Sequence, residues 1–256
     1  MLIRSIISPL NSINIVARAA WGLVLTVFCT RRFPLKILSG KRVVLVGPAS
    51  SSLNTCQGAF IDSFDLVVRL NKAPLQLKDG RFAEDIGTRT DILFHSFFEN
   101  EFSGGGQLDF DLYSRLGIAY VIQPVSTLQG WRVIFNFYKK YLKAKRVFTL
   151  PSRPFDELES SMAPFKPTTG LCAMKCLMES ELSELHIIGF TFFRTAYGEG
   201  YRDEMKSADQ AREYISKMKI HDPDQEFREF NKMLKAVRNK KVVMDRTLQN
   251  IVDNEH

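Results

Sequence analysis

The sequence has few of the residues that hold metal-dependent or disulfide-rich folds together. It contains four cysteines and four histidines in 256 residues. Cys172 and Cys176 lie one helical turn apart, but no second pair with neighbouring histidines completes a zinc-binding spacing. We therefore interpret all four cysteines, which include Cys29 and Cys56, as small hydrophobic residues of a reduced protein.

Internal repeats, low-complexity tracts and the signatures of nucleic-acid-binding modules are also absent. Lysine and arginine together number 35 and acidic residues 28, which gives a formal net charge of +7. This excess favours anionic partners such as phosphate esters, acidic sugars or an anionic membrane surface. Charge alone does not exclude nucleic acid, but without a zinc-finger, basic-heptad or RNA-binding pattern we expect no nucleic-acid partner.

A long uninterrupted apolar run is lacking too. Residues 13–29 are mostly apolar, but Arg18 interrupts them, and residues 19–29 are fewer than the roughly 20 that a membrane-spanning helix needs. An interfacial helix and a span that begins near Ile6 both remain open. No small-residue cleavage pattern follows, which favours a retained anchor over a removed signal peptide.

The N-terminal segment is expected to be separate from the globular part. Arg31, Arg32 and Lys36 follow the apolar run. We therefore predict that residues 1–35 form a membrane-anchor or interfacial segment with a linker, and that residues 36–256 form one domain with a single sizeable core.

The rest of the chain has the alternating pattern of an α/β domain with a mostly parallel sheet. Strands are predicted at residues 43–46, 66–69, 91–95, 119–123, 147–150, 185–189 and 242–244. Helices are predicted at residues 53–61, 128–142, 170–183, 208–219 and 225–238.

Two segments place turn residues where a helix begins. Gly47 and a serine-rich turn follow the first predicted strand, so backbone N–H groups can face a phosphate or a ribose. A Pro-Thr-Thr-Gly segment begins the helix predicted at residues 170–183, and Thr168 or Thr169 occupies the position of an N-cap. Each segment alone also fits a plain structural role, as a turn without ligand or an ordinary cap.

A third segment contains His221 and, five residues later, Glu226 at the start of a helix. Such a histidine can present its imidazole to a cleft, while the carboxylate anchors the loop or holds the ring tautomer. On spacing alone, a surface histidine is the more ordinary interpretation.

Together the three segments resemble the sialyl motifs of glycosyltransferase family 29, the animal-type sialyltransferases. The long motif of that family reads Gly-x-x-Ile-Asp-x-x-Asp-x-Val-x-Arg-x-Asn-x-Ala-Pro after a strand and Gly-Asn-Ser. The matching residues here are Gly47, Gly58, Ile61, Asp62, Asp65, Val67, Arg69, Asn71, Ala73 and Pro74. Residues 84–90 resemble the tail of the long motif, the Pro-Thr-Thr-Gly segment with residues 187–190 resembles the small motif, and His221 with Glu226 resembles the very small motif.

The resemblance implies a GT-A-like variant of the nucleotide-binding, Rossmann-like fold, with a single mostly parallel sheet flanked by helices. It also implies no metal and no cofactor other than the CMP-sugar donor substrate. His221 is then the catalytic base of an inverting displacement, and Glu226 is structural or orienting. The residues expected to hold the nucleotide are Gly47, Ser50, Asn71, Thr168, Thr169 and Gly170.

The activity implied is transfer of sialic acid from CMP-sialic acid to a hydroxyl of a glycan or glycolipid acceptor. Two alternatives remain: a transferase for another CMP-sugar such as CMP-Kdo, and a CMP-sugar-binding protein without catalysis. The implied location is membrane-associated, in the Golgi if the source is eukaryotic and at the cytoplasmic membrane face if it is bacterial or viral.

The sequence departs from the family pattern at two places in the nucleotide site. Pro48 replaces the usual asparagine, which removes an amide side chain and a backbone donor. The histidine that precedes the very small motif in the family has no counterpart, since the four histidines are His95, His186, His221 and His256. Tyr197 or Tyr201 could donate a hydrogen bond to phosphate instead, and Arg202 is a charged alternative.

Two further patterns bear on cofactors and redox state. Asp109-Phe110-Asp111 and Asp222-Pro223-Asp224 look like the metal-binding Asp-x-Asp of other glycosyltransferases, but a CMP donor has one phosphate and no diphosphate to bridge, so we expect both to be coincidental. The usual family disulfide is not expected, because Val43 and Glu181 stand near the positions of its cysteines.

Overall fold

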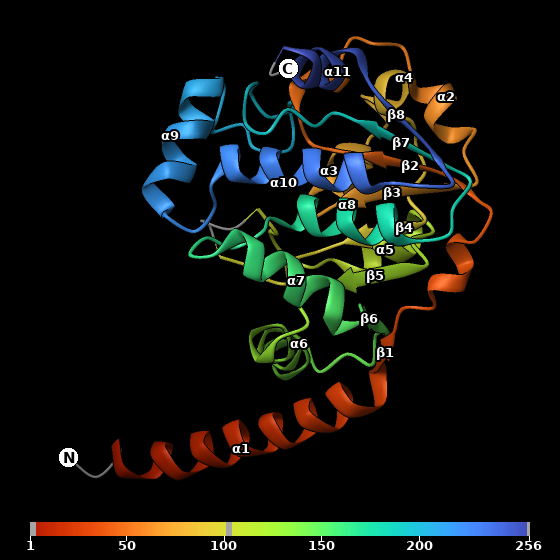
Figure 1. Cartoon of the computed structure of the whole chain (residues 1–256). Coiled ribbons are helices and arrows are strands. Elements are labelled where there is room, and N and C mark those ends of the chain that lie inside the picture. The colour runs from red at the N-terminus through yellow and green to blue at the C-terminus, as the bar shows by residue number, and fades with distance from the viewer. Residues whose placement is uncertain (1–3, 101–103, 255–256) are drawn as a thin grey trace.

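The centre of the molecule is one eight-stranded sheet with helices on both faces (Figure 1). The computed structural model describes residues 4–100 and 104–254. The strand order is β1-β6-β5-β4-β3-β2-β7-β8, and every strand pairing in the sheet is parallel. The predicted α/β class with a single parallel sheet is therefore confirmed.

The element bounds are as follows. The strands are β1 (Thr30–Arg32), β2 (Arg42–Val46), β3 (Leu66–Leu70), β4 (Ile92–Phe94), β5 (Tyr120–Gln123), β6 (Val147–Thr149), β7 (Glu184–Ile188) and β8 (Lys241–Met244). The α-helices are α1 (Arg4–Cys29), α2 (Gly58–Asp62), α3 (Ala73–Leu77), α4 (Ala83–Ile86), α5 (Phe110–Arg115), α6 (Leu128–Tyr141), α7 (Ser152–Met162), α8 (Thr169–Glu179), α9 (Ala208–Met218), α10 (Pro223–Ala236) and α11 (Arg246–Asp253). Two 3₁₀ turns complete the chain, η1 (Leu35–Leu38) and η2 (Ser50–Ser52).

All seven predicted strands are present within two residues of their expected ends, and the sequence reading missed only the short edge strand β1. The helix predicted at residues 53–61 is wrong in its first half. There the chain forms η2 and then a turn in which Asn54 and Cys56 have positive φ, and α2 begins only at Gly58. A right-handed helix cannot pass through residues with positive φ, which is why it starts late.

The strands are apolar on both faces, as expected for a parallel sheet covered on both sides. Val43, Val44, Leu45 and Val46 of β2 are each at most 2% exposed. Residues of β2 alternate between a core formed with α7, α8, α10 and α11 and a smaller core formed with α2 and α4. A third cluster lies between α1, α5, α6 and strands β4 to β6.

Helix α1 lies against α6 at the β1–β6 side of the sheet, and its N-terminal half extends beyond the rest of the molecule (Figure 1). Gly22 permits the close approach, since a Cβ there would be 2.9 Å from the Cα of Lys139. Leu25 is buried beside it, and Arg18 donates to the Lys140 carbonyl at 2.6 Å. Among the described residues, no helix combines the length and the hydropathy that crossing a membrane requires.

The sheet order has a switch beside β2. Strands β2 to β6 follow one another outward on one side, whereas β7 and β8 lie on the other side of β2. In open parallel sheets, ligands bind at the carboxyl edge where the order reverses in this way. The loops after β2, β3 and β7 are therefore the expected location of a site.

Candidate active site

A cavity of about 450 Å³ opens at this carboxyl edge. Segments far apart in the sequence line it: the turn after β2, the end of β3, the N-terminus of α8, the loop after β7, and the segment before α10. Of the residues predicted to form the site, the cavity brings together Asn71, Thr168, Thr169, Gly170, Tyr201, His221 and Glu226.

The N-terminus of α8 forms one wall. Thr168 is the N-cap, and its Oγ1 accepts from the Leu171 N–H at 3.2 Å. Thr169 and Gly170 follow in the first turn and also line the cavity. First-turn amides and the positive end of the helix dipole favour an anion at this position.

Glu226 connects α10 to the start of α8. Its two carboxylate oxygens accept from the backbone N–H of Thr168 at 2.7 Å and from the Thr168 hydroxyl at 2.9 Å. Burial raises the pKa of Glu226 to about 8, although the two bonds from Thr168 oppose that shift. The carboxyl group therefore fixes the position of the threonine turn beside the cavity.

His221 is half-buried, and its Nδ1 lies 2.6 Å from the carbonyl oxygen of Lys166. Because a carbonyl can only accept, Nδ1 carries the proton and Nε2 is left as the acceptor. Burial lowers the pKa of His221, which favours the neutral ring at neutral pH. The prediction that Glu226 holds the ring tautomer is wrong, because the Lys166 carbonyl does so; the other predicted role, anchoring the loop, fits the contacts with Thr168.

Asn71 and Tyr201 come from different loops and lie next to each other in the cavity wall. Asn71 has a positive φ of 47°, and its Oδ1 accepts from the Ser96 N–H at 3.0 Å. Burial raises the pKa of Tyr201 to about 12, and the neighbouring Asn71 and Arg202 partly offset this. Tyr201 therefore keeps its hydroxyl proton at physiological pH and can donate it.

Arg202 places a buried positive charge in the cavity wall. The residue is 3% exposed, and its guanidinium carbon lies 5.8 Å from the ring centre of Tyr197 and 5.0 Å from that of Tyr214. Tyr197 in turn stacks on Tyr201 at 5.6 Å. The cation and the three tyrosine rings thus form one packed group, and all of them line the cavity.

Gly47 and Ser50 do not line the cavity; Pro48 and Ala49 between them do. A Cβ on Gly47 would lie 2.3 Å from the Gly189 carbonyl oxygen, so this glycine allows the turns after β2 and β7 to touch. The N–H of Ser50 donates to the Ala196 carbonyl at 2.9 Å. The turn after β2 therefore holds the loop that carries the tyrosines.

Pro48 contributes to the same contact. Its carbonyl oxygen accepts from the Gly198 N–H at 2.7 Å, and Ala49 forms a single antiparallel bridge with Tyr197. The missing N–H of Pro48 is consequently not needed for this contact between the two loops. Nothing in the sequence indicated that these segments, about 150 residues apart, pair with each other.

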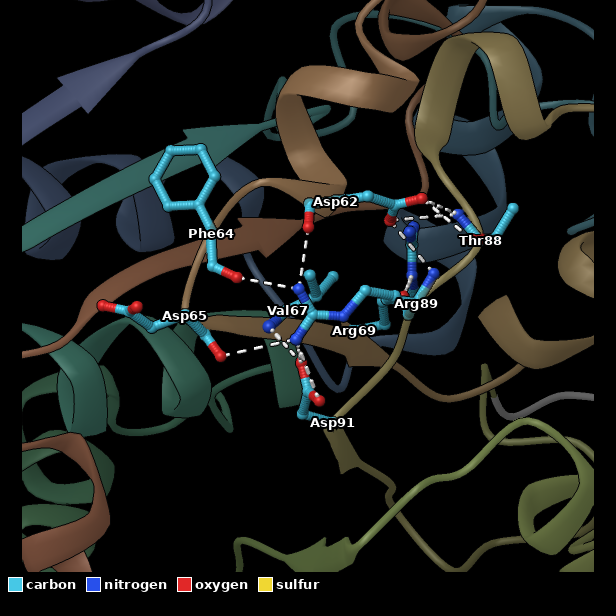
Figure 2. A network of polar contacts seen from close by, with 8 residues as sticks. All are labelled: Asp62, Phe64, Asp65, Val67, Arg69, Thr88, Arg89 and Asp91. Carbon is cyan, nitrogen blue, oxygen red and sulfur yellow. Dashed lines mark hydrogen bonds and ion pairs between the residues drawn. The ribbon is translucent and has the colours of Figure 1, made fainter.

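The charged residues of the long motif form a separate network, drawn in Figure 2. Asp62 accepts from the N–H and hydroxyl of Thr88, both at 2.8 Å, and Arg89 donates to the carbonyls of Asp62 and Phe64 at 2.7 and 2.9 Å. Arg89 also pairs with Asp91 at 3.1 Å. The network ties the β3 and β4 segments together away from the cavity.

Arg69 belongs to the same network and is 1% exposed. Its guanidinium donates to the carbonyl oxygens of Arg89, at 2.9 Å, and Ile86. Burial lowers the pKa of Arg69 to about 10. A buried cation with its donors directed at carbonyl oxygens has a structural role, and Arg69 does not line the cavity.

Both Asp-x-Asp patterns are helix starts. Asp109 caps α5 by accepting from the N–H groups of Asp111 and Leu112, and Asp222 caps α10 by accepting from those of Asp224 and Gln225. Among residues 4–100 and 104–254, no three His, Cys, Asp or Glu side chains are grouped closely enough to hold a metal ion. The four cysteines are all free thiols.

Comparison with known proteins agrees with this architecture. The fold resembles that of two crystal structures of a mammalian sialyltransferase, each with a TM-score of 0.51. The first, in complex with Gal-β-1-3GalNAc-ortho-nitrophenol, is 16% identical and the match covers 86% of this chain and 77% of that one. The second is 17% identical, with coverage of 88% and 78%. These two sialyltransferase structures therefore share the fold of this chain.

Two sequence matches agree with the predicted resemblance to a known family. The profile of glycosyltransferase family 29 (sialyltransferase) matches residues 31–111. The mouse (Mus musculus) type 2 lactosamine α-2,3-sialyltransferase is 25% identical over 59% of this chain and 50% of its own length. The chain thus spans about half the length of that relative, and the two matches confirm the predicted resemblance to glycosyltransferase family 29.

Proposed function

We propose that this chain is a sialyltransferase that moves sialic acid from CMP-sialic acid to a hydroxyl of a glycan acceptor, with inversion and without a metal. The observation that carries the proposal is the environment of His221. A neutral imidazole with Nδ1 bonded to the Lys166 carbonyl shares one cavity with the α8 N-terminus and a buried arginine.

The donor would be held across the cavity from β3 to α8. Asn71 and the Thr168–Gly170 turn would contact the nucleotide, and the first-turn amides of α8 suit a charged group. Arg202 and the Tyr201 hydroxyl would face the phosphate. A buried guanidinium and a protonated phenol both stabilise negative charge that grows as the phosphate departs.

In the chemical step, an acceptor hydroxyl oxygen attacks the anomeric carbon of sialic acid from the face opposite CMP. Nε2 of His221 takes the hydroxyl proton as the new C–O bond forms. The bond between the anomeric carbon and the phosphate oxygen breaks, and CMP leaves with the electron pair. Arg202 would stabilise the departing phosphate, in place of the family histidine that this sequence lacks.

Two alternatives share the fold. Another CMP-sugar such as CMP-Kdo would use the same nucleotide contacts, and a CMP-sugar-binding protein without catalysis would account for Pro48 and the absent histidine. The full chain should be given each CMP-sugar in turn with N-acetyllactosamine, the acceptor type in the name of the mouse relative. CMP release above spontaneous hydrolysis identifies the donor. CMP binding without turnover for any donor would favour the inactive alternative and contradict the transferase proposal.

We also propose a membrane-surface location for α1. Its outward side chains, among them Trp21, Val27 and Phe28, are apolar and exposed, while Arg31 and Arg32 follow directly and are exposed too. Apolar residues with flanking positive charge suit an anionic membrane surface. The surface would be that of the Golgi in a eukaryote, or the cytoplasmic membrane face in a bacterium or for a viral protein.

A further inference from the structure

Residues 96–100, in the loop after β4, form part of the wall of the cavity that contains His221. We call them the cavity-wall segment. Phe97 and Glu99 do not line the cavity, whereas the residues on either side of each do: Ser96, Phe98 and Asn100. The side chains of Phe97 and Glu99 contact α6 instead. The contacts with α6 therefore determine where the three lining residues lie.

Phe97 is the apolar contact between the segment and α6. Its ring centre lies 5.6 Å from that of Phe137, edge to face, and the residue is 5% exposed. The backbone of Phe97 has a φ of 61°, in the left-handed region that a bulky residue rarely adopts. Such a conformation persists only where surrounding contacts hold it, and it is common at ligand sites. The cavity-wall segment therefore depends on contacts outside itself to keep its shape.

Glu99 is the polar contact between the segment and α6. Its Oε2 accepts from Nζ of Lys140 at 2.8 Å. Its Oε1 accepts from the Tyr141 hydroxyl at 2.5 Å and from the N–H of Leu108 at 2.9 Å. Burial alone would raise the pKa of Glu99, but the bonds from Lys140 and Tyr141 lower it, so the group is a carboxylate at neutral pH. The carboxylate thus has three donors, two of them on α6.

The end of α6 that bonds to Glu99 is held in place by α1. Arg18 donates to the carbonyl of Lys140 at 2.6 Å. Gly22 packs on Lys139, where a Cβ would lie 2.9 Å from the backbone N. Lys140 therefore contacts α1 through its carbonyl and the cavity-wall segment through its ammonium group. Because the helix end is fixed on one side, it can fix the segment on the other.

The cavity-wall segment also bonds to Asn71 at the end of β3. The N–H of Ser96 donates to Oδ1 of Asn71 at 3.0 Å. Nδ2 of Asn71 lies near Gly104, where a Cβ would be 3.6 Å away, and both residues line the cavity. A displacement of the segment would therefore also move the Asn71 amide.

We propose that Glu99 is a positioning residue for nucleotide binding, because its bonds to α6 hold the cavity-wall segment and, through Ser96, the side chain of Asn71. This inference rests on the proposed function, in which Asn71 contacts the nucleotide. Glu99 does not line the cavity and acts through these other residues. Its replacement should therefore weaken donor binding and leave the chemical step, which uses His221, nearly unchanged.

The first test measures CMP binding and donor kinetics with the full chain. Glu99→Ala should raise the Kd for CMP and the KM for CMP-sialic acid by about tenfold, because hydrogen bonds to a charged group are lost, while kcat changes by less than about twofold. Asp111→Ala is the control, since it removes an exposed carboxylate 2.9 Å from Lys143 and does not line the cavity. An unchanged Kd for the folded Glu99→Ala variant would overturn the proposal.

A conservative variant tests whether the bonds of Glu99 matter rather than its charge. Glu99→Gln keeps an oxygen that can accept from Tyr141 and Leu108, and Lys140, whose side chain is 55% exposed, can turn to solvent. Its Kd for CMP should therefore stay within about threefold of the wild-type value. A loss as large as that of Glu99→Ala would contradict a role that acts through these bonds.

A second set of variants tests the route through α6. Lys140→Met and Tyr141→Phe together remove both donors on α6 and keep the Lys140 carbonyl that Arg18 uses. This double variant should lose CMP affinity about as much as Glu99→Ala, and it takes the place of that variant should Glu99→Ala fail to fold. Adding Glu99→Ala to it should weaken binding no further. Additive losses would show that Glu99 does not act through α6.

Thermal unfolding separates positioning from a purely structural role. A lower Tm for Glu99→Ala with an unchanged Kd for CMP would mean that Glu99 only stabilises the fold, which would overturn the inference and leave the proposed function intact. A wild-type chain that binds no CMP would instead overturn the nucleotide site itself, and the inference with it.

Discussion

His221 and Glu226 are five residues apart and bond to the same short segment, residues 166–168, through different atoms. The imidazole uses the Lys166 carbonyl, and the carboxyl uses the amide and hydroxyl of Thr168. The contact with Lys166 determines which ring nitrogen of His221 carries the proton, and the contact with Glu226 fixes the position of Thr168. The spacing in the sequence indicated that the two act together, but not which one fixes the tautomer.

Replacing His221 by Ala should lower kcat about 10²- to 10⁴-fold, because a general base contributes that much. CMP affinity should change little, since the imidazole acts on the acceptor proton. Steady-state kinetics with calorimetric CMP titration measure both. His186→Ala, at a half-buried histidine of β7 that does not line the cavity, is the control for loss of an imidazole. An unchanged kcat in the His221→Ala variant would show that His221 is not the catalytic base.

The pH profile gives a second check on His221. Burial lowers its pKa below the usual 6.5. The ring accepts a proton only when neutral. The value of kcat/KM should therefore not vary with pH near pH 7, and it should fall as pH decreases through that lowered pKa. An acidic limb centred above pH 6.5 would assign the base to another group.

Glu226→Gln should change how stability depends on pH. Between about pH 4.5 and pH 8, the unfolded chain loses a proton that the native carboxyl keeps, so stability falls as pH rises through this window. The glutamine variant lacks this contribution. The Tm of the variant minus the Tm of the wild type should therefore increase by roughly 5 °C between pH 5 and pH 8. Exposed Glu157→Gln is the control. Parallel Tm curves for wild type and Glu226→Gln would contradict the shifted pKa.

At the scale of elements, the strands were the most predictable part of the fold. Each buried strand is a short β-branched run, and such runs are visible without any tertiary information. The turn that contains the positive-φ residues Asn54 and Cys56 was not predictable, because the N–H groups of Thr55 and Cys56 donate to Asp85 on α4, about 30 residues away. Asp109 and Asp222 stand in Asp-x-Asp patterns that we expected to be coincidental, and the structure shows them as the N-caps of α5 and α10.

Helix α1 should bind vesicles through its outward face. Val27→Asp together with Phe28→Asp should weaken cosedimentation with phosphatidylserine-containing vesicles by about tenfold or more, because both side chains are exposed and apolar, at 62% and 67%. Asn14→Asp and Ser39→Asp together give a control of the same charge. Equal binding of the two double variants would show that the apolar face of α1 does not contact the membrane.

For the whole molecule, the cavity depends on a contact that no local pattern encodes. The turn after β2 bonds to the loop after β7 through Pro48, Ala49 and Ser50, and that contact positions Tyr197 and Tyr201. The long motif predicted a nucleotide site near Gly47; Asn71 of the motif lines the cavity, and the charged residues of the motif brace β3 and β4 (Figure 2). The sequence thus indicated the correct edge of the sheet, the carboxyl edge. Which residues line the cavity there depends on how loops distant in the sequence contact each other.

Ligand binding to the native cavity should raise the stability of the whole chain by mass action. At CMP concentrations about 100 times its Kd, the expected gain is about 2.7 kcal/mol, which corresponds to a Tm increase of roughly 6 °C for a chain of this size. EDTA should leave both the shift and the turnover unchanged, because the proposed function has the single phosphate held by Arg202 and the α8 amides rather than by a metal. Arg202→Met should remove most of the shift, whereas Arg153→Met, on the exposed side of α7, should keep it. A CMP shift that requires a divalent ion, or one that Arg202→Met leaves intact, would mean that the phosphate is bound by other groups than those in this cavity wall.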